Sequence, residues 1–318
     1  MQAAASSEPI QILSPVRPRP RKPLLALAFP YLLIAPTFVI VFLFTLKPTA
    51  SAVFDSLQRP ARLPQDPPTY VGLDNYADLF DPTHHIGSRF GRILGNTVLF
   101  AFGTVVIATP LALMFALMLN RKLRGIGLWR FSFVYPSLLP LIGGASIWAF
   151  IFADQVGLAT AILRAFGLRD VNWLGDPNLV LISVIAINIW SQAGYYMLFY
   201  LAGLQSIPRD LYEAAALDGA GYRQQLVYLT LPLLRRSTLF VLTVSFTFAF
   251  QTVEQLQALT EGGPGDRSNL LLFFIFQNIG ERRNWGYINA MTVMLAGIVF
   301  IFTLSNFLFF ERRGRETS

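Results

Sequence analysis

The chain has 318 residues, of which 54% are hydrophobic and only 14% are charged, and its mean hydropathy is +0.50. This composition excludes a soluble globular protein and predicts a protein that resides in a lipid bilayer. The formal net charge is +7, and the lack of cysteine excludes disulfide and thiolate chemistry.

Six segments without Lys, Arg or Asp are long enough to cross about 30 Å of hydrocarbon as helices, at roughly 20 residues each. We expect an all-α membrane protein with a basic N-terminal tail at 1–23, a six-span domain at 24–310 and a short tail at 311–318. The expected spans are 24–46, 93–119, 131–153, 179–204, 237–257 and 288–310. The first apolar run is longer than a signal-peptide core, so we interpret it as a retained anchor.

The distribution of basic residues predicts the orientation of the chain. With both termini in the cytoplasm, the inner segments hold 15 Lys and Arg over 74 positions, and the outer segments hold 10 over 101. The positive-inside rule therefore favours cytoplasmic N- and C-termini. The basic clusters flank the membrane lipid and fix the orientation of the chain, and they form no single surface that would indicate nucleic-acid binding.

The third and fourth expected spans carry polar groups that are costly to expose to lipid. Pro136 and Pro140 flank Ser137 and should bend the third helix, which would free carbonyls toward a cavity. In the fourth span, four polar residues recur at helical spacing on one face: Asn188, Ser191, Gln192 and Tyr195. This face either lines a solute path or forms hydrogen bonds between helices.

The fifth expected span has two polar faces, and either could line a solute path. Thr243, Thr247, Gln251 and Glu254 share one face, whereas Ser245, Ala249 and Thr252 share the other. Glu254 is the only carboxylate inside an expected span and lies near one end of it.

A polar segment at 205–232 separates the fourth and fifth spans. Residues 212–232 fit two short helices, broken where Asp218 and Gly219 supply a left-handed turn. Pro232 comes near the start of the next apolar run, where its missing N–H costs little. The alanine-rich face of the first helix suits close docking to another protein.

Three separated motifs resemble permease subunits of binding-protein-dependent ABC importers. Glu213-Ala214-Ala215, Gly219, Leu229 and Leu231-Pro232 have the spacing of the family's cytoplasmic coupling loop, with Leu229 where isoleucine is usual. The segment 70–76 with Leu79-Phe80, and Thr260 with Gly262-Gly263-Pro264, resemble two outer segments of sugar permeases. The likeness covers most of 24–310 and is nearest to the glycerol-3-phosphate and maltose permease group.

This resemblance implies the type I importer permease fold in a bacterial cytoplasmic (inner) membrane. It also implies a second homologous permease subunit, two ATPase subunits that bind ATP and Mg, and an extracytoplasmic solute-binding protein. The chain itself is expected to hold no catalytic residue, metal or cofactor. None of its three lysines follows a glycine as a Walker A motif requires, so ATP would be hydrolysed by another chain. The residues implied in coupling to the ATPase are Glu213, Ala214, Ala215, Asp218, Gly219, Leu231 and Pro232.

The resemblance further places solute contacts at Ser137, Asn188, Ser191, Gln192, Ser245, Ala249 and Thr252, to which we add Tyr195, Gln251 and Glu254 from the helical faces. Amides, hydroxyls and aromatic rings suit a sugar or polyol. A phosphate would prefer a cation, which the expected spans lack, yet the family likeness keeps a glycerol-3-phosphate or other phosphate-ester importer as an alternative. A stand-alone channel or receptor-like membrane protein would explain the spans but not the ordered 205–232 segment.

Overall fold

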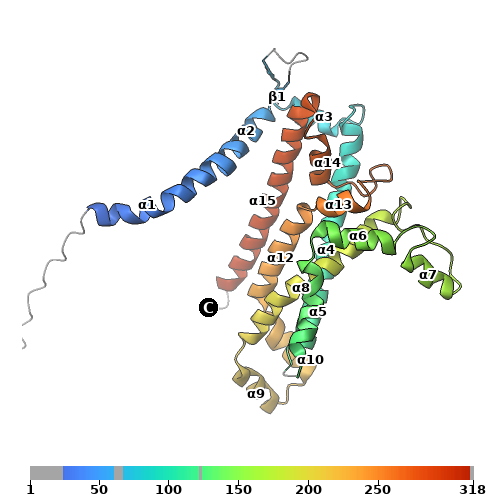
Figure 1. The fold of residues 1–318 in the computed structure, drawn as a ribbon. Helices are drawn as coiled ribbons and strands as arrows, with labels where there is room; N and C mark the ends of the chain where they lie inside the picture. Colours follow the sequence, from blue (N-terminus) through green and yellow to red (C-terminus); the bar gives the residue numbers. More distant parts are fainter. Residues whose placement is uncertain (1–23, 61–66, 122–123, 316–318) are drawn as a thin grey trace, which may run out of the picture. The chain divides into compact units, whose positions relative to one another are not determined.

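The computed structural model describes residues 24–60, 67–121 and 124–315, whose helices are joined by turns and loops and accompanied by one short hairpin (Figure 1). The N-terminal tail 1–23 and the end of the C-terminal tail lie outside the described residues. The chain divides into two compact units, Met1–Ser51 and Ala52–Ser318. The elements are α1 (Leu24–Val41), η1 (Phe42–Leu46), α2 (Lys47–Asp55), β1 (Gln58–Arg59), β2 (Thr69–Tyr70), α3 (Asp74–Phe80), α4 (Gly87–Leu119), α5 (Ile126–Leu138), α6 (Leu141–Ile151), α7 (Leu158–Ala165), α8 (Val180–Gln205), α9 (Arg209–Leu217), α10 (Tyr222–Gln224), η2 (Gln225–Thr230), α11 (Leu231–Leu233), α12 (Arg235–Phe250), α13 (Glu254–Leu259), α14 (Leu271–Asn278), η3 (Arg282–Asn284) and α15 (Trp285–Arg315).

The first unit contains the whole of the first expected span, 24–46. Helix α1 continues through the π-helix η1 into α2, and the stretch Phe29–Asp55 is long and apolar enough to cross a membrane. The helix therefore extends nine residues beyond the expected end at residue 46.

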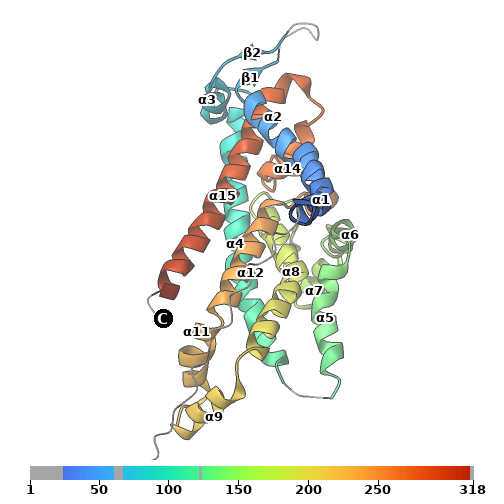
Figure 2. The ribbon, with the colours of Figure 1, turned by 90° about the vertical axis from the view of Figure 1, so that its left-hand side faces the viewer.

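The core of the second unit is built on α4 and α8, which pack along each other. Ala101, Ala108, Ala112 and Ala116 on α4 are fully buried, and their small side chains let neighbouring helices approach closely. On α8, Gly194 lies so close to the carbonyl oxygen of Phe133 in α5 that a Cβ would overlap it. Helix α12 packs on α4, α8 and α15, and Figure 2 shows these helices side by side.

One of the expected spans is bent in the structure, and a second bend precedes the fifth expected span. Helices α5 and α6 meet at 95° across Leu139 and Pro140, which confirms the bend predicted from the prolines. The stretch Tyr222–Leu233 meets α12 at 64°. Among the described residues, four helices are long and apolar enough to span a membrane, or up to six if each bent pair counts as one span.

The fifth expected span was wrong at its C-terminal end. Helix α12 stops at Phe250, so Gln251 and Thr252 lie in a break and Glu254 begins the separate helix α13. The β-branched pair Thr252-Val253 favours the extended backbone, and the buried side chain of Gln255 anchors α13 across α8. Glu254 therefore lies outside the spanning helix, and the alignment of Gln251 and Glu254 with the threonines of α12 is lost.

The end of the second unit that carries the hairpin β1–β2 is held by ionic and hydrogen-bonded contacts. The Tyr287 hydroxyl donates to the Asp78 carboxylate (2.9 Å), which also pairs with Arg59. Because the phenol has one proton, His84 Nε2 must donate to the Tyr287 oxygen (3.2 Å), while His84 Nδ1 accepts from the Ile86 N–H. His84 is therefore the neutral imidazole with its proton on Nε2. Its pKa is lowered below the ordinary value of 6.5, mainly by burial.

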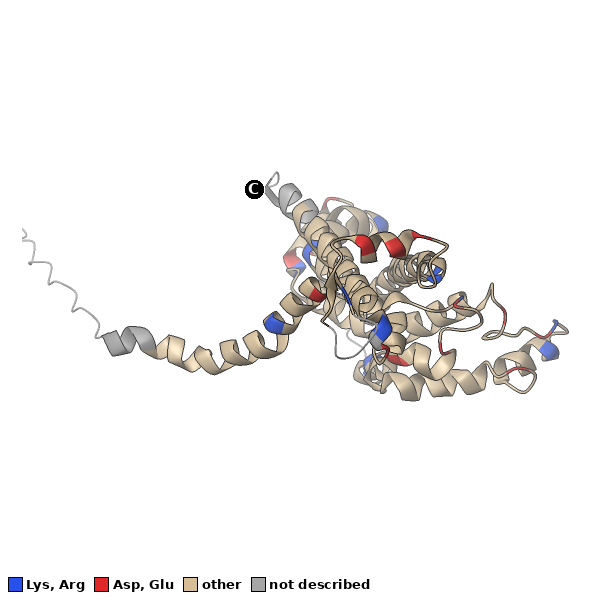
Figure 3. Ribbon diagram, turned by 90° about the horizontal axis from the view of Figure 1, so that it is seen from above, with Lys and Arg blue, Asp and Glu red and all other residues tan. Residues whose placement is uncertain are grey.

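Arg89 at the hairpin end of this bundle is ion-paired, whereas several of the described arginines at the opposite end are not. At the hairpin end, Arg89 forms a bidentate pair with Asp266 (2.6 and 2.7 Å), which lowers the pKa of that carboxyl group. At the opposite end, Arg121, Arg124 and Arg209 form no salt bridge within the described parts of the chain. Figure 3 shows that most of the helical ribbon carries neither sign of charge.

Candidate solute path and coupling segment

Asn188 on α8 is part of a buried hydrogen-bonded connection to α13. Its side-chain amide donates to Gln255 Oε1 at 3.0 Å, and Gln255 Nε2 donates to the carbonyl of Val184 at 3.0 Å. Both amides are at least 95% buried. Of the two uses left open for Asn188, the structure shows the interhelical hydrogen bond. Sequence reasoning missed Gln255, because a continuous fifth helix leaves that residue without a predicted partner.

The rest of the α8 stripe lies on a more open side of the helix. Gln192 and Tyr195 are half-buried, and the Tyr195 ring stacks on Phe248 of α12 with centroids 6.0 Å apart. One turn from Tyr195, the Phe199 ring packs on Phe240 at 4.8 Å. Phe248 is 41% exposed and was also missed, because one phenylalanine in an apolar helix gives no sequence signal.

Two amides lie between the contacts that join α8 to α12 and α13. Gln192 lies on α8 between Asn188 and Tyr195, and Gln251 lies in the chain between Phe248 and Gln255, so both amides fall between the Asn188–Gln255 and Tyr195–Phe248 contacts. Gln251 is exposed, and neither side-chain amide forms a hydrogen bond to another described residue. Two unsatisfied amides beside an aromatic pair form a surface that can bind hydroxyl groups. We refer to Gln192, Tyr195, Phe248 and Gln251 as the amide–aromatic seam.

The second polar face of α12 points into the bundle. Ser245, Ala249 and Thr252 are 0%, 2% and 6% exposed. The Ser245 hydroxyl donates to the Leu242 carbonyl, and the Thr252 hydroxyl donates to that of Phe248. These three residues therefore pack inside the chain in this conformation, whereas Gln251 of the first face stays accessible.

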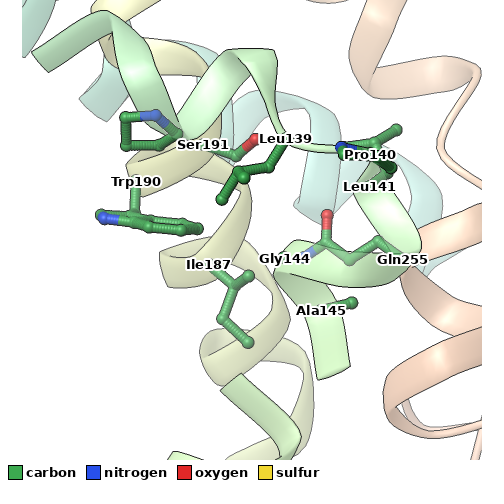
Figure 4. A pocket seen from close by; sticks show the side chains of 10 residues that line it. Leu139, Pro140, Leu141, Gly144, Ala145, Ile187, Trp190, Ser191 and Gln255 are labelled. Atoms are coloured by element: carbon green, nitrogen blue, oxygen red, sulfur yellow. The ribbon is translucent and has the colours of Figure 1, made fainter. Parts of the chain in front are cut away.

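The bend between α5 and α6 adjoins α8 at a small cavity of about 10 Å³, which has room for about one water molecule (Figure 4). Ser191 lines it together with Gln255, and the indole of Trp190 lies beside it. Ser137 is half-buried and donates to the Val134 carbonyl at 2.7 Å. Ser191 and Ser137 therefore lie at the helix bend and not on the amide–aromatic seam.

The predicted turn of the 205–232 segment is present. Helix α9 ends at Leu217, and Gly219 has φ +82°, the left-handed conformation that glycine adopts without penalty. The Gly219 N–H donates to the Ala216 carbonyl and the Ala220 N–H to that of Ala215, the two bonds of a Schellman motif. These bonds satisfy carbonyls that the helix end leaves free.

The faces of α9 and the following turn are open. Glu213, Ala214, Asp218 and Gly219 are exposed, and Leu217 is 89% exposed. A hollow of about 400 Å³ lies between the end of α9 and η2. Its lining residues are Ala215, Asp218, Gly219, Ala220, Gln224, Gln225, Tyr228 and Leu229.

Hydrogen bonds hold this helix–turn–helix together. The Thr230 hydroxyl donates to the Gln225 carbonyl (3.1 Å), so the Tyr212 hydroxyl must be the donor in its 3.0 Å contact with Thr230. Leu231 and Pro232 are exposed and begin α11, directly after the π-helix η2. Proline has no backbone N–H, and its absence is tolerated in the first turn of a helix.

A helical bundle with span-length apolar helices and an exposed, ordered helix–turn–helix at one end is the architecture of a membrane protein with an accessible docking segment. Residues 108–313 match the family described as binding-protein-dependent transport system inner membrane component, and the chain belongs to this family. The chain is 34% identical to the trehalose/maltose transport system permease protein MalF of Thermococcus litoralis, over 86% of this chain and 90% of that protein. It is 32% identical to the sn-glycerol-3-phosphate transport system permease protein UgpA of Agrobacterium fabrum, over 89% and 95%.

The fold also resembles that of a solved importer. The crystal structure of a bacterial ABC transporter involved in the import of the acidic polysaccharide alginate contains a chain that matches with a TM-score of 0.78 and 20% identity, over 91% of this chain and 97% of that one. The predicted all-α permease fold and the predicted likeness to maltose and glycerol-3-phosphate permeases are confirmed. The chain is therefore the permease subunit of a binding-protein-dependent importer, and not an enzyme.

Proposed function

We propose that this permease translocates a neutral sugar, polyol or small oligosaccharide. The observation that carries this proposal is the amide–aromatic seam, where the free amides of Gln192 and Gln251 lie between the Tyr195–Phe248 ring pair and the Asn188–Gln255 bond. An amide can both donate to and accept from a sugar hydroxyl, and an aromatic ring packs against the apolar C–H face of a sugar. Relatives named for trehalose/maltose and for arabinooligosaccharides support this class of solute.

A phosphate ester is the second candidate, because other relatives are named for sn-glycerol-3-phosphate. A phosphate monoester would need Arg or Lys beside the seam, and neither 180–205 nor 237–257 contains one. Arg89 and Arg92 lie at the hairpin end of α4 and are bonded to Asp266 and to the Gly265 carbonyl. The charge of this chain therefore favours the neutral solute.

The proposed importer contains further subunits. A second permease would cover the seam and enclose the path, since lipid contact with two free amides is unfavourable. Two ATPase subunits, each binding ATP and Mg, would dock at α9 and the hollow beside Gly219, with Glu213 facing an ATPase arginine. Both chain termini would then lie in the cytoplasm, and the binding protein would deliver solute at the hairpin end.

A ligand screen of the cognate solute-binding protein tests the proposed substrate. Thermal unfolding of that protein is measured with a panel of neutral sugars, polyols and phosphate monoesters. We expect a neutral sugar or polyol to raise its melting temperature and glycerol-3-phosphate to leave it unchanged. Stabilisation by phosphate esters alone would contradict the proposal. Co-purification of an ATPase subunit with this chain tests the proposed assembly.

A further inference from the structure

A groove of about 280 Å³ follows one side of α4 near the end that carries the coupling segment. Its apolar lining lies at helical spacing from one turn to the next, and an arginine and a tyrosine close one end. The lining residues are Pro110, Leu113, Met114, Leu117, Met118, Arg121 and Tyr222. From Pro110 to the end of α4 at Leu119 the groove runs along about 14 Å of helix.

The groove is open because the next helix in the chain packs elsewhere. Helix α5 lies mainly against α8, so it leaves this side of α4 uncovered. Met114 is 47% exposed and Met118 is 58% exposed. Methionine side chains are flexible and adapt to an irregular apolar partner, and in a membrane the molecules that meet such a surface are lipid acyl chains.

The arginine end of the groove continues into a second, more polar cavity of about 210 Å³. The two cavities share Leu117, Arg121 and Tyr222, and the second adds hydrogen-bonding side chains that include Asn120 and Gln225. No carboxylate lines either cavity among the described residues. Within the same part of the chain, the guanidinium of Arg121 has neither a salt bridge nor a hydrogen bond.

We propose that this site binds one anionic phospholipid. The acyl chain lies along Pro110 to Met118, and the phosphate accepts hydrogen bonds from Arg121 and from the Tyr222 hydroxyl. The polar headgroup enters the second cavity. Charge complementarity identifies the ligand, since a cation without a carboxylate partner lies where the apolar groove meets the polar cavity.

The site joins α4 to the coupling segment, because Tyr222 and Gln225 belong to α10 and η2. A bound lipid therefore bridges the bundle and the segment that follows Gly219. If the proposed function is correct, anionic lipid fixes the position of that segment against α4. Binding itself requires only the geometry of this chain, so it can be tested apart from transport.

Native mass spectrometry of the purified full chain in detergent, titrated with phosphatidylglycerol or phosphatidylcholine, tests the proposal. We expect saturable binding of one phosphatidylglycerol and at least tenfold weaker binding of phosphatidylcholine. Arg121→Gln should weaken phosphatidylglycerol binding about tenfold more than Arg124→Gln does, because Arg124 is an exposed arginine three residues away that lines neither cavity. Arg121→Lys keeps the charge and should retain most of the binding.

Two further arms distinguish a lipid site from a site for free phosphate and from general charge attraction. Met118→Trp fills the groove and should also lower binding at least tenfold, and soluble glycerol phosphate should not displace the lipid. Equal losses in Arg121→Gln and Arg124→Gln would show non-specific charge attraction and overturn the proposal. Unchanged binding in Met118→Trp, or displacement by glycerol phosphate, would overturn it as well. Failure of the solute screen described above leaves each of these outcomes unaffected.

Discussion

Replacement of Asn188 by leucine should destabilise the bundle and leave the amide–aromatic seam intact. The change removes the amide that donates to Gln255 Oε1 at 3.0 Å, and it leaves that oxygen buried without a donor. An interhelical hydrogen bond in a membrane protein contributes about 1 kcal/mol, and an unsatisfied buried acceptor raises the loss to about 1–3 kcal/mol. For a chain of this size, such a loss corresponds to a fall of roughly 2–8 °C in melting temperature.

Thermal unfolding of the purified protein in detergent measures this loss, and a double-mutant cycle assigns it to the pair. Gln255→Leu alone should be destabilising because it breaks the bonds to both Asn188 and Val184. The double variant should cost less than the sum of the two single variants, since replacing both partners removes the unsatisfied group. Additive losses, or an unchanged melting temperature in Asn188→Leu, would refute the reasoning.

Three other predictions follow from the turn, the hairpin end and the orientation. Gly219→Val should cost about 1–2 kcal/mol at φ +82° and abolish ATPase co-purification, whereas the protein still inserts into the membrane. The pKa of His84 is lowered in the folded state, so the stability that neutral His84 contributes is present above pH 6.5 and is lost as the pH falls below that value. The melting temperature should therefore drop between pH 7 and pH 5. The variant His84→Gln should show a smaller drop. A reporter that is active only outside the cytoplasm should work when fused near Gly265 and be silent near Arg223; the reverse pattern would overturn the predicted orientation.

The parts of the fold that local sequence determines were predictable. The apolar runs identified the long helices, Pro136 and Pro140 identified the 95° bend, and Gly219 identified the left-handed turn. Each of these features depends on hydropathy or on the backbone preference of one residue. The local sequence alone therefore determines these helices, this bend and this turn.

The features that depend on contacts between distant segments were not predictable. The end of α12 at Phe250 depends on how Gln255 fits against α8, which hydropathy does not report. Helical spacing grouped Asn188 with Gln192, yet the bond to Gln255 separates them into a structural residue and an open one. Gln192 and Gln251 could be recognised as neighbours of the aromatic pair only from the contact between Tyr195 on α8 and Phe248 on α12.

The most direct test of the proposed solute site is uptake by the complete importer carrying Gln192→Leu. Uptake of the solute identified with the binding protein is measured in cells and normalised to the amount of assembled complex. We expect uptake to fall at least tenfold while assembly and melting temperature stay unchanged, because Gln192 bonds no other described residue. Leu198→Ala, a partly exposed apolar position on the same helix, should transport normally. Normal uptake per assembled complex in Gln192→Leu would contradict the assignment of the amide–aromatic seam to the solute.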